Sequence, residues 1–159
     1  MARPVRRVVT GVDPSGRSVV VSDAEAPTVV GDSPVHDAEY GGFQIIELWQ
    51  TTSTPPDLSG EDLSGRPFEL DPVPGGVHWR IVSFPQMDER GRIHKTETVD
   101  LLYIVSGRIY VGVGDDEASL VETLLGPGDA IVALANVHCW RNPGPEPCVA
   151  VATMISAVR

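Results

Sequence analysis

Residues 94–113 read HKTETVDLLYIVSGRIYVGV, and residues 128–142 read GDAIVALANVHCWRN. Both stretches are rich in β-branched and aromatic residues, and polar and apolar positions alternate along parts of each, as they do in half-buried strands. Tight-turn sequences interrupt them, with Ser106-Gly107 inside the first stretch and Gly126-Pro127-Gly128-Asp129 leading into the second. The pattern therefore predicts short strands joined by turns.

The same pattern continues on either side of these two stretches. β-branched runs flank Asp13-Pro14-Ser15-Gly16, which has the backbone preferences of a turn, so an N-terminal hairpin is expected over residues 6–22. Further strands are expected at residues 43–51, 77–84, 100–106, 108–113, 120–125, 130–134, 137–141 and 147–157. Residues 52–76 are rich in Pro, Gly, Ser and Asp and predict a long loop. No internal repeat and no helix is expected.

Composition sets the size and class of the chain. At 159 residues it has the length of one domain that can bury a core without disulfides. Its 16 glycines and 14 prolines suit many strands and turns better than long helices. The two cysteines, Cys139 and Cys148, lack the spacing of a zinc or redox motif and are expected to be reduced, packed thiols.

The charge of the chain argues against nucleic acid as a partner. Its formal net charge is −10, which would repel a phosphate backbone. Residues 1–10 hold three arginines but no apolar run of secretory type, and no stretch approaches the length of a membrane span. We therefore expect a cytoplasmic protein that binds neither nucleic acid nor membrane.

The spacing of His94, Asp100 and Gly107 resembles the first motif of the cupin superfamily, in which two histidines two residues apart precede a glutamate and a turn glycine. Gly128-Asp129 followed by His138 and Asn142 resembles the second motif, and the two motifs lie within residues 91–142. The resemblance implies an all-β fold: a cupin jelly-roll β-barrel of two antiparallel sheets with an N-terminal hairpin. It also implies one domain over residues 1–159, with the hairpin and an arm in 1–42 and the barrel in 43–159.

More narrowly, the chain resembles a group of small microbial cupins of mostly unsettled function, some of them associated with polyketide and aromatic natural products. Thr96 stands where the family has its second metal-binding histidine, and Asp100 where it has the glutamate. The proline and glycine that usually precede the second-motif histidine are also missing, because residues 133–137 read ALANV. The metal site that the family implies is therefore degenerate.

Alternation along a strand places His94, Thr96, Thr98 and Asp100 on one face, and His138 and Trp140 on one face of another strand. In a cupin both faces point inward. His94, Asp100 and His138 then have the composition of the two-histidine, one-carboxylate triad that binds non-haem iron. The cofactor stays open between a divalent metal (Fe, Mn, Ni or Zn) held by these three residues and no metal at all.

Without a metal the same three residues are candidates for proton chemistry, since histidine titrates nearest neutrality and burial raises a carboxyl pKa. His94 or His138 would act as general base, while Asp100 would orient that imidazole or protonate a leaving hydroxyl. Thr96 and Thr98 would bind substrate, with Thr96 donating to a carbonyl, and Trp140 would supply an apolar wall. Elimination of water or an enolisation is the reaction class that suits this set.

Three functions follow from these alternatives. The first is a tailoring enzyme of lyase, dehydratase or isomerase type that acts on a small oxygenated, polyketide or aromatic metabolite. The second is an Fe(II)-dependent oxygenase with His94, Asp100 and His138 as ligands. The third is a cupin that binds a ligand without catalysis, its histidines being satisfied core polar groups.

The remaining expectations concern residues outside the motifs. His36 lies in a polar loop and is expected to be solvated, whereas His78 lies on a strand of undetermined register and is a minor pocket candidate. Tyr103 and Tyr110 are expected to pack on strands. The N-terminal hairpin and the 52–76 loop could add to a neighbour's sheet, which predicts a homodimer.

Overall fold

The computed structural model describes residues 4–31, 41–58 and 61–158, so His36 lies outside the described residues. The described chain is all-β, and its strands are antiparallel. In chain order they are β1 (Arg6–Val12), β2 (Ser18–Glu25), β3 (Thr28–Val30), β4 (Gln44–Thr51), β5 (Val77–Phe84), β6 (Thr98–Ser106), β7 (Ile109–Val113), β8 (Val121–Leu125), β9 (Ala130–Leu134), β10 (His138–Arg141) and β11 (Cys148–Ser156). None of the described segments is a helix that could cross a membrane.

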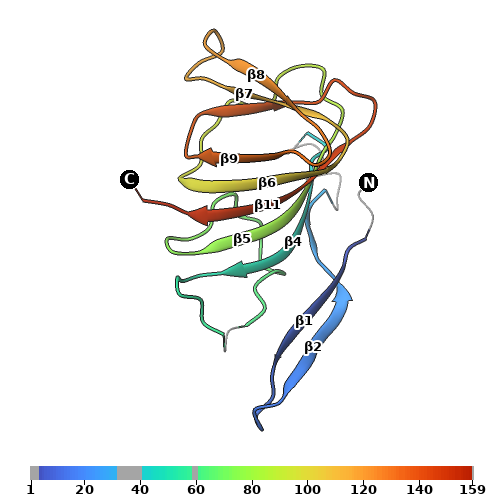
Figure 1. The fold of residues 1–159 in the computed structure, drawn as a ribbon, viewed down its shortest axis with the longest axis vertical. Coiled ribbons are helices and arrows are strands. Elements are labelled where there is room, and N and C mark those ends of the chain that lie inside the picture. Colours follow the sequence, from blue (N-terminus) through green and yellow to red (C-terminus); the bar gives the residue numbers. More distant parts are fainter. Residues whose placement is uncertain (1–3, 32–40, 59–60, 159) are drawn as a thin grey trace.

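Two sheets form the jelly-roll body, and a separate hairpin extends from it (Figure 1). The larger sheet has the order β3-β4-β5-β11-β6-β9, and the smaller sheet has the order β10-β7-β8. β1 and β2 pair only with each other and form the hairpin. The predicted fold class, a cupin-like barrel of two antiparallel sheets with an N-terminal hairpin, is confirmed.

The predicted strands are present with small differences at their ends. β1, β5 and β9 have the predicted bounds, and β6 begins two residues earlier than expected, at Thr98. β2 continues three residues past the predicted end at residue 22. β3 was not expected from the sequence, because three residues between a proline and a glycine are too short to show a strand pattern. It pairs with β4 and forms one edge of the large sheet.

One end of the barrel interior is apolar. Ile104 and Ile109 are fully buried there, and Phe84 packs against Trp140 with ring centroids 5.2 Å apart. Burial of each such side chain contributes about 1.5–3 kcal/mol. This cluster of aliphatic and aromatic side chains is the main core, and it joins the two sheets.

The base of the hairpin covers the outer face of β4. Ala26 packs with Ile46 and Leu48 in a second apolar cluster. Arg7 donates hydrogen bonds to the Leu48 carbonyl at 3.0 Å and to the Ser64 hydroxyl at 2.6 Å. Because Ser64 lies in the predicted long loop, one arginine links both this loop and the hairpin to β4.

The tip of the hairpin is the turn expected from its sequence. The Asp13 carboxylate accepts hydrogen bonds from the backbone N–H groups of Ser15 at 2.8 Å and Arg17 at 3.0 Å. Gly16 has φ of +83°, a backbone conformation that glycine adopts without steric cost. The turn residues therefore determine where the chain reverses.

A buried ion pair holds the long loop against the barrel. Arg80 on β5 and Glu47 on β4 are paired in register, with 2.7 Å between Arg80 Nε and Glu47 Oε2, and both side chains are almost wholly buried. The same guanidinium donates to the carbonyls of Leu70 at 2.9 Å and Glu69 at 2.6 Å. The interior of the barrel thus fixes the position of a loop segment that has no strand partner of its own.

Replacing Arg80 with methionine should destabilise the protein by about 3–5 kcal/mol, because Glu47 is left buried without its cation. Urea denaturation followed by tryptophan fluorescence measures the change. The control is Arg66→Met, which removes an exposed ion pair with Glu61 of 3.9 Å and should leave the unfolding midpoint almost unchanged. Equal midpoints for the two variants would show that the buried pair is not needed for stability.

Candidate active site

His94 and His138 form the centre of the candidate site. Their backbones are bridged in antiparallel fashion: His94 N–H donates to the His138 carbonyl at 3.0 Å, and His138 N–H donates to the His94 carbonyl at 2.9 Å. Residues paired in this way present their side chains on the same face. The ring centroids are accordingly 4.4 Å apart.

Backbone carbonyls orient both imidazoles in the same way. His94 Nδ1 lies 2.9 Å from the Arg92 carbonyl oxygen, and His138 Nδ1 lies 3.0 Å from the Asn136 carbonyl oxygen. A carbonyl only accepts hydrogen bonds, so each Nδ1 carries a proton, and the neutral form of each ring has its lone pair on Nε2. The pair therefore offers two basic nitrogens, each held by the residue two positions earlier in the chain.

The loop before His138 is backbone-strained. Ala135 has φ of +49°, in the left-handed region that residues with a Cβ seldom adopt. Its N–H donates to the Thr98 carbonyl at 3.0 Å, which anchors the loop to β6. The missing proline and glycine of the family motif are thus replaced by an alanine in a left-handed turn, and this turn presents the Asn136 carbonyl to His138.

Asp100 ends a chain of hydroxyl groups. Thr98 Oγ1 donates to Thr96 Oγ1 at 2.7 Å, and Thr96 Oγ1 donates to Asp100 Oδ2 at 3.2 Å. All three side chains are buried, as expected for the inward face of this strand. Thr96 directs its proton to Asp100 here, so its predicted donation to a substrate carbonyl stays a prediction. Asp100 Oδ1 is buried and has no partner within the described chain.

Trp140 lies on the same face as His138, as its spacing predicts. The two rings meet edge to face with centroids 5.6 Å apart, and the other side of Trp140 contacts Phe84. Trp140 therefore separates the polar half of the interior from the apolar core. Cys139 is also buried, beside Gly112 of the neighbouring strand β7, and it is a free thiol like Cys148.

His78 lies in the interior, which the sequence left undecided. It pairs in register with Met154, and Met154 pairs on its other side with Asp100, so the three side chains form one row across β5, β11 and β6. All three are buried. The polar residues His78 and Arg80 alternate with exposed Trp79 along β5, and this alternation is the sequence signal for an inward polar face. Glu47 gives a similar signal as the one charged residue of an apolar strand.

Burial and charge keep His78 and His138 neutral. Burial, and to a smaller degree the Arg80 guanidinium, lowers the pKa of His78 to about 4. The pKa of His138 is also lowered, mainly by burial, while its hydrogen bond to the Asn136 carbonyl opposes this shift and the nearby His94 ring adds to it. Burial raises the pKa of Glu47 against the opposing effect of Arg80. His138 is therefore a neutral base at physiological pH.

The donor set meets only part of the requirement for a metal. Two imidazoles with free Nε2 atoms and carbonyl-bound Nδ1 atoms have the arrangement of metal-binding histidines. A third ligand is needed for the two-histidine, one-carboxylate triad. Among the residues that the structure describes, no three His, Cys, Asp or Glu side chains are grouped closely enough to hold an ion, so Asp100 does not complete a three-ligand site with the two histidines.

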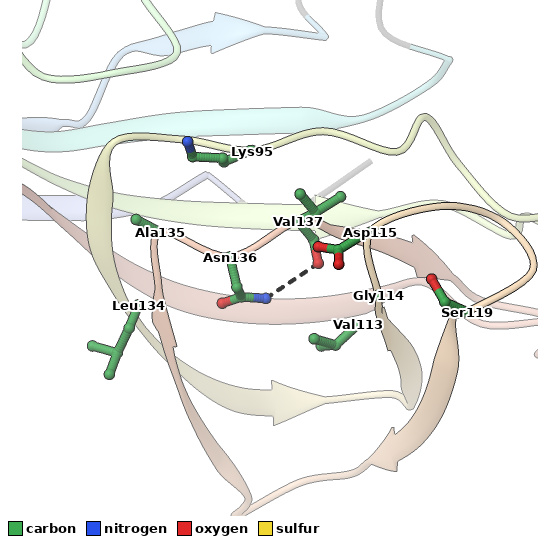
Figure 2. Close-up of a pocket in the computed structure, with 9 residues that line it drawn as sticks. All are labelled: Lys95, Val113, Gly114, Asp115, Ser119, Leu134, Ala135, Asn136 and Val137. Carbon is green, nitrogen blue, oxygen red and sulfur yellow. Dashed lines mark hydrogen bonds between the residues drawn. The ribbon is translucent and has the colours of Figure 1, made fainter. Parts of the chain in front are cut away.

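A surface pocket of about 490 Å³ lies beside the histidine loop (Figure 2). Its lining includes Lys95, Ala135 and Asn136, and Asn136 is the residue whose carbonyl holds His138. Lys95 also forms an ion pair with Glu97, so its charge is already compensated. The pocket and the interior site thus share the strained loop as a wall.

Comparison with known proteins agrees with the jelly-roll fold and the histidine pair described above. The arrangement is that of a small jelly-roll protein with paired histidines inside one barrel. The family model described as "Cupin domain" matches residues 81–154, which contain the histidine pair and Asp100. The match covers a little under half of the chain, and residues 81–154 are thus similar to a cupin domain.

Solved structures that resemble this chain do so at low sequence identity. An ethanolamine utilization protein Q structure from Salmonella typhimurium is 8% identical over 99% of this chain and 100% of that chain, with a TM-score of 0.50. KdgF from Halomonas sp. is 19% identical over 72% of this chain and 80% of its own, with a TM-score of 0.47. An RmlC-like cupin from Shewanella frigidimarina is 18% identical over 74% and 78%, with a TM-score of 0.45. No protein of curated function matches the chain in sequence.

The low pKa of His78 predicts a pH dependence of stability. The folded pKa is about 4 against the ordinary 6.5, so the unfolded chain binds a proton more readily between these values. The contribution of His78 to stability is therefore complete above pH 6.5 and is lost as the pH falls toward 4. Urea unfolding at a series of pH values should show a steeper loss for the native protein than for His78→Gln, which cannot titrate. Equal slopes would contradict the neutral, buried state of His78.

Proposed function

We propose that this protein is a small-molecule tailoring enzyme of lyase, dehydratase or isomerase type, acting on an oxygenated polyketide or aromatic metabolite inside the barrel. The observation that supports the proposal is the pair of imidazoles 4.4 Å apart, both presenting Nε2 because both Nδ1 atoms are bound to carbonyls. A neutral base beside a second proton-carrying group is the arrangement that elimination and enolisation require.

In the proposed dehydration, His138 Nε2 removes a proton from the carbon next to a substrate carbonyl. The electron pair of that C–H bond forms a C=C bond as the C–O bond to a neighbouring hydroxyl breaks. His138 then gives this proton to the departing oxygen, which leaves as water, while Asp100 accepts a hydrogen bond from a substrate hydroxyl. His94 is only partly buried, so it can exchange the proton held by His138 with solvent before that proton is returned. An isomerisation uses the same first step and returns the proton to a different carbon.

Solvent deuterium exchange tests this proposal. A panel of β-hydroxy ketones with phenyl or alkyl substituents is incubated with the protein in D2O, and binding and α-proton exchange are both followed by NMR. Panel members that bind should exchange or dehydrate. His138→Ala should reduce this rate by about 10²–10⁴-fold, the usual contribution of a positioned general base. The exposed Val132→Ala serves as control.

Two outcomes would count against the proposed chemistry. Panel members that bind yet neither exchange nor lose water would favour the alternative of a cupin that binds without catalysis. An exchange rate that His138→Ala leaves unchanged would show that another group is the base.

The Fe(II)-dependent oxygenase remains the second candidate, because the two Nε2 atoms fit a metal even though Asp100 does not complete the triad. A bound ion would act as a Lewis acid on a substrate oxygen or support oxygen chemistry. Elemental analysis of tag-free protein, before and after anaerobic reconstitution with Fe(II), separates the candidates. We expect substoichiometric metal in both samples. Near-stoichiometric metal that disappears in the His94→Ala, His138→Ala double variant would favour the oxygenase.

We also propose that the protein is a cytoplasmic homodimer. Both cysteines are free thiols, which suits a reducing compartment. Val8, Val12 and Val20 are half to two-thirds exposed on the hairpin, and isolated two-stranded ribbons are only marginally stable in water. A second copy of the chain would cover these valines.

Light scattering at micromolar concentration should give the mass of a dimer, and Val12→Asp with Val20→Asp should give a monomer. Val132→Asp, on the exposed face of β9, is the matched control and should leave the dimer intact. A monomeric native protein would refute the dimer without affecting the proposed site.

A further inference from the structure

Two buried polar atoms face the same part of the barrel interior without a partner. His78 Nδ1 and Asp100 Oδ1 have none within the described chain, and their residues are only 5% and 6% exposed. A buried polar atom without a hydrogen bond is energetically costly, so such atoms are normally paired with protein, water or ligand. Both atoms can therefore take water or a ligand as the missing partner.

The sheet register positions the two atoms for a common ligand. His78 and Asp100 are separated by the single strand β11, which contributes Met154 between them. Since neighbouring strands are about 4.8 Å apart, the two backbones lie about 10 Å apart across the sheet. Met154 has an unbranched side chain that can adjust its shape, so it suits the floor of a site between two polar walls.

The charges around this place disfavour an anion. Two interior carboxyl groups, Glu47 and Asp100, accompany the buried Arg80, and Arg80 is already engaged by Glu47 and by the carbonyls of the long loop. His78 supplies no positive charge near neutral pH, because burial keeps it unprotonated. A carboxylate or phosphate would therefore meet a carboxyl group and no available cation.

A hydroxyl group satisfies both orphan atoms. It can donate a hydrogen bond to Asp100 Oδ1, and it can either donate to or accept from His78 Nδ1, whichever tautomer the ring adopts. An ether or a hydrocarbon could not donate to Asp100, and the carboxyl would remain unsatisfied. The same place thus selects for donors and against negative charge.

We propose that His78 and Asp100 form the recognition end of a ligand site in the barrel interior and bind an uncharged ligand through its hydroxyl groups, with Met154 as the floor between them. The inference deepens the proposed function, since it names the substrate class of the same interior site. His78 is a specificity-determining residue in this scheme, and the proton chemistry belongs to His138 on the other sheet.

The test compares three small aromatic probes with the chelator-treated native protein: resorcinol, resorcinol dimethyl ether and benzoate. Isothermal calorimetry or ligand-observed NMR measures each affinity. Resorcinol should bind about tenfold or more tightly than either of the others, because losing a hydrogen bond to a buried polar group costs roughly this factor or more. Equal affinity for resorcinol and its dimethyl ether, a preference for benzoate, or no binding of resorcinol at millimolar concentration would overturn the proposal.

A matched pair of variants assigns the selectivity to His78. His78→Phe should reduce resorcinol affinity about tenfold or more and leave the affinity of the dimethyl ether nearly unchanged. Trp79→Phe changes the next residue of the same strand, whose side chain is exposed on the opposite face, and should preserve the resorcinol preference. An unchanged preference in His78→Phe would overturn the role of His78. The comparison of probes on the native protein stands even where that variant does not fold.

His138→Ala separates this inference from the proposed chemistry. The variant should retain the preference for resorcinol over its dimethyl ether while losing proton exchange on the ketone panel. Hydroxyl-selective binding without turnover would contradict only the proposed enzyme activity. Turnover without hydroxyl selectivity would contradict only the recognition by His78 and Asp100.

Discussion

The two hydrogen bonds between the backbones of His94 and His138 are the constraint on which the site depends. They join the segment that leads into β6 of the large sheet to the first residue of β10 in the small sheet. The same segment also meets β10 farther along, where Met87 N–H donates to the Asn142 carbonyl at 2.6 Å and Gly91 N–H donates to the Trp140 carbonyl at 2.8 Å. An irregular stretch thus covers an edge of β10 that would otherwise expose unpaired backbone groups. The pairing that closes this part of the barrel is also the one that brings the two imidazoles together.

The interior is divided into an apolar half and a polar half, with Trp140 between them. The apolar half supplies the burial free energy, and it needs no ligand because it contains few polar atoms. The polar half holds a buried ion pair, three imidazoles and a carboxyl group, which are costly to remove from water. Arg80 recovers part of that cost by binding Glu47 and two loop carbonyls. His78, Asp100 and Glu47 each retain one buried polar atom without a hydrogen-bond partner in the described chain.

The two histidines share a local device. Each ring is oriented by the carbonyl of the residue two positions before it, so neither depends on a distant side chain for its tautomer. For His138 this carbonyl belongs to a loop in which Ala135 is forced into a left-handed conformation. Such strain is tolerated where the surrounding hydrogen bonds hold the loop, here through the Thr98 carbonyl. Stability is thus sacrificed locally for a defined orientation of one nitrogen.

The sequence by itself determined the strand pattern, the hairpin turn at Asp13 and Gly16, and the shared inward face of Thr96, Thr98 and Asp100, because turn chemistry and two-residue alternation are local properties. It also identified His94 and His138, whose spacing resembles known motifs. Only the tertiary structure decided that His78 points inward and that Arg80 is buried against Glu47. It also decided that Asp100 accepts a hydrogen bond from Thr96 and does not complete a three-ligand metal site with the two histidines. Those facts depend on which strands become neighbours and in which register, and strand pairing joins residues too far apart in the chain for any local pattern to encode.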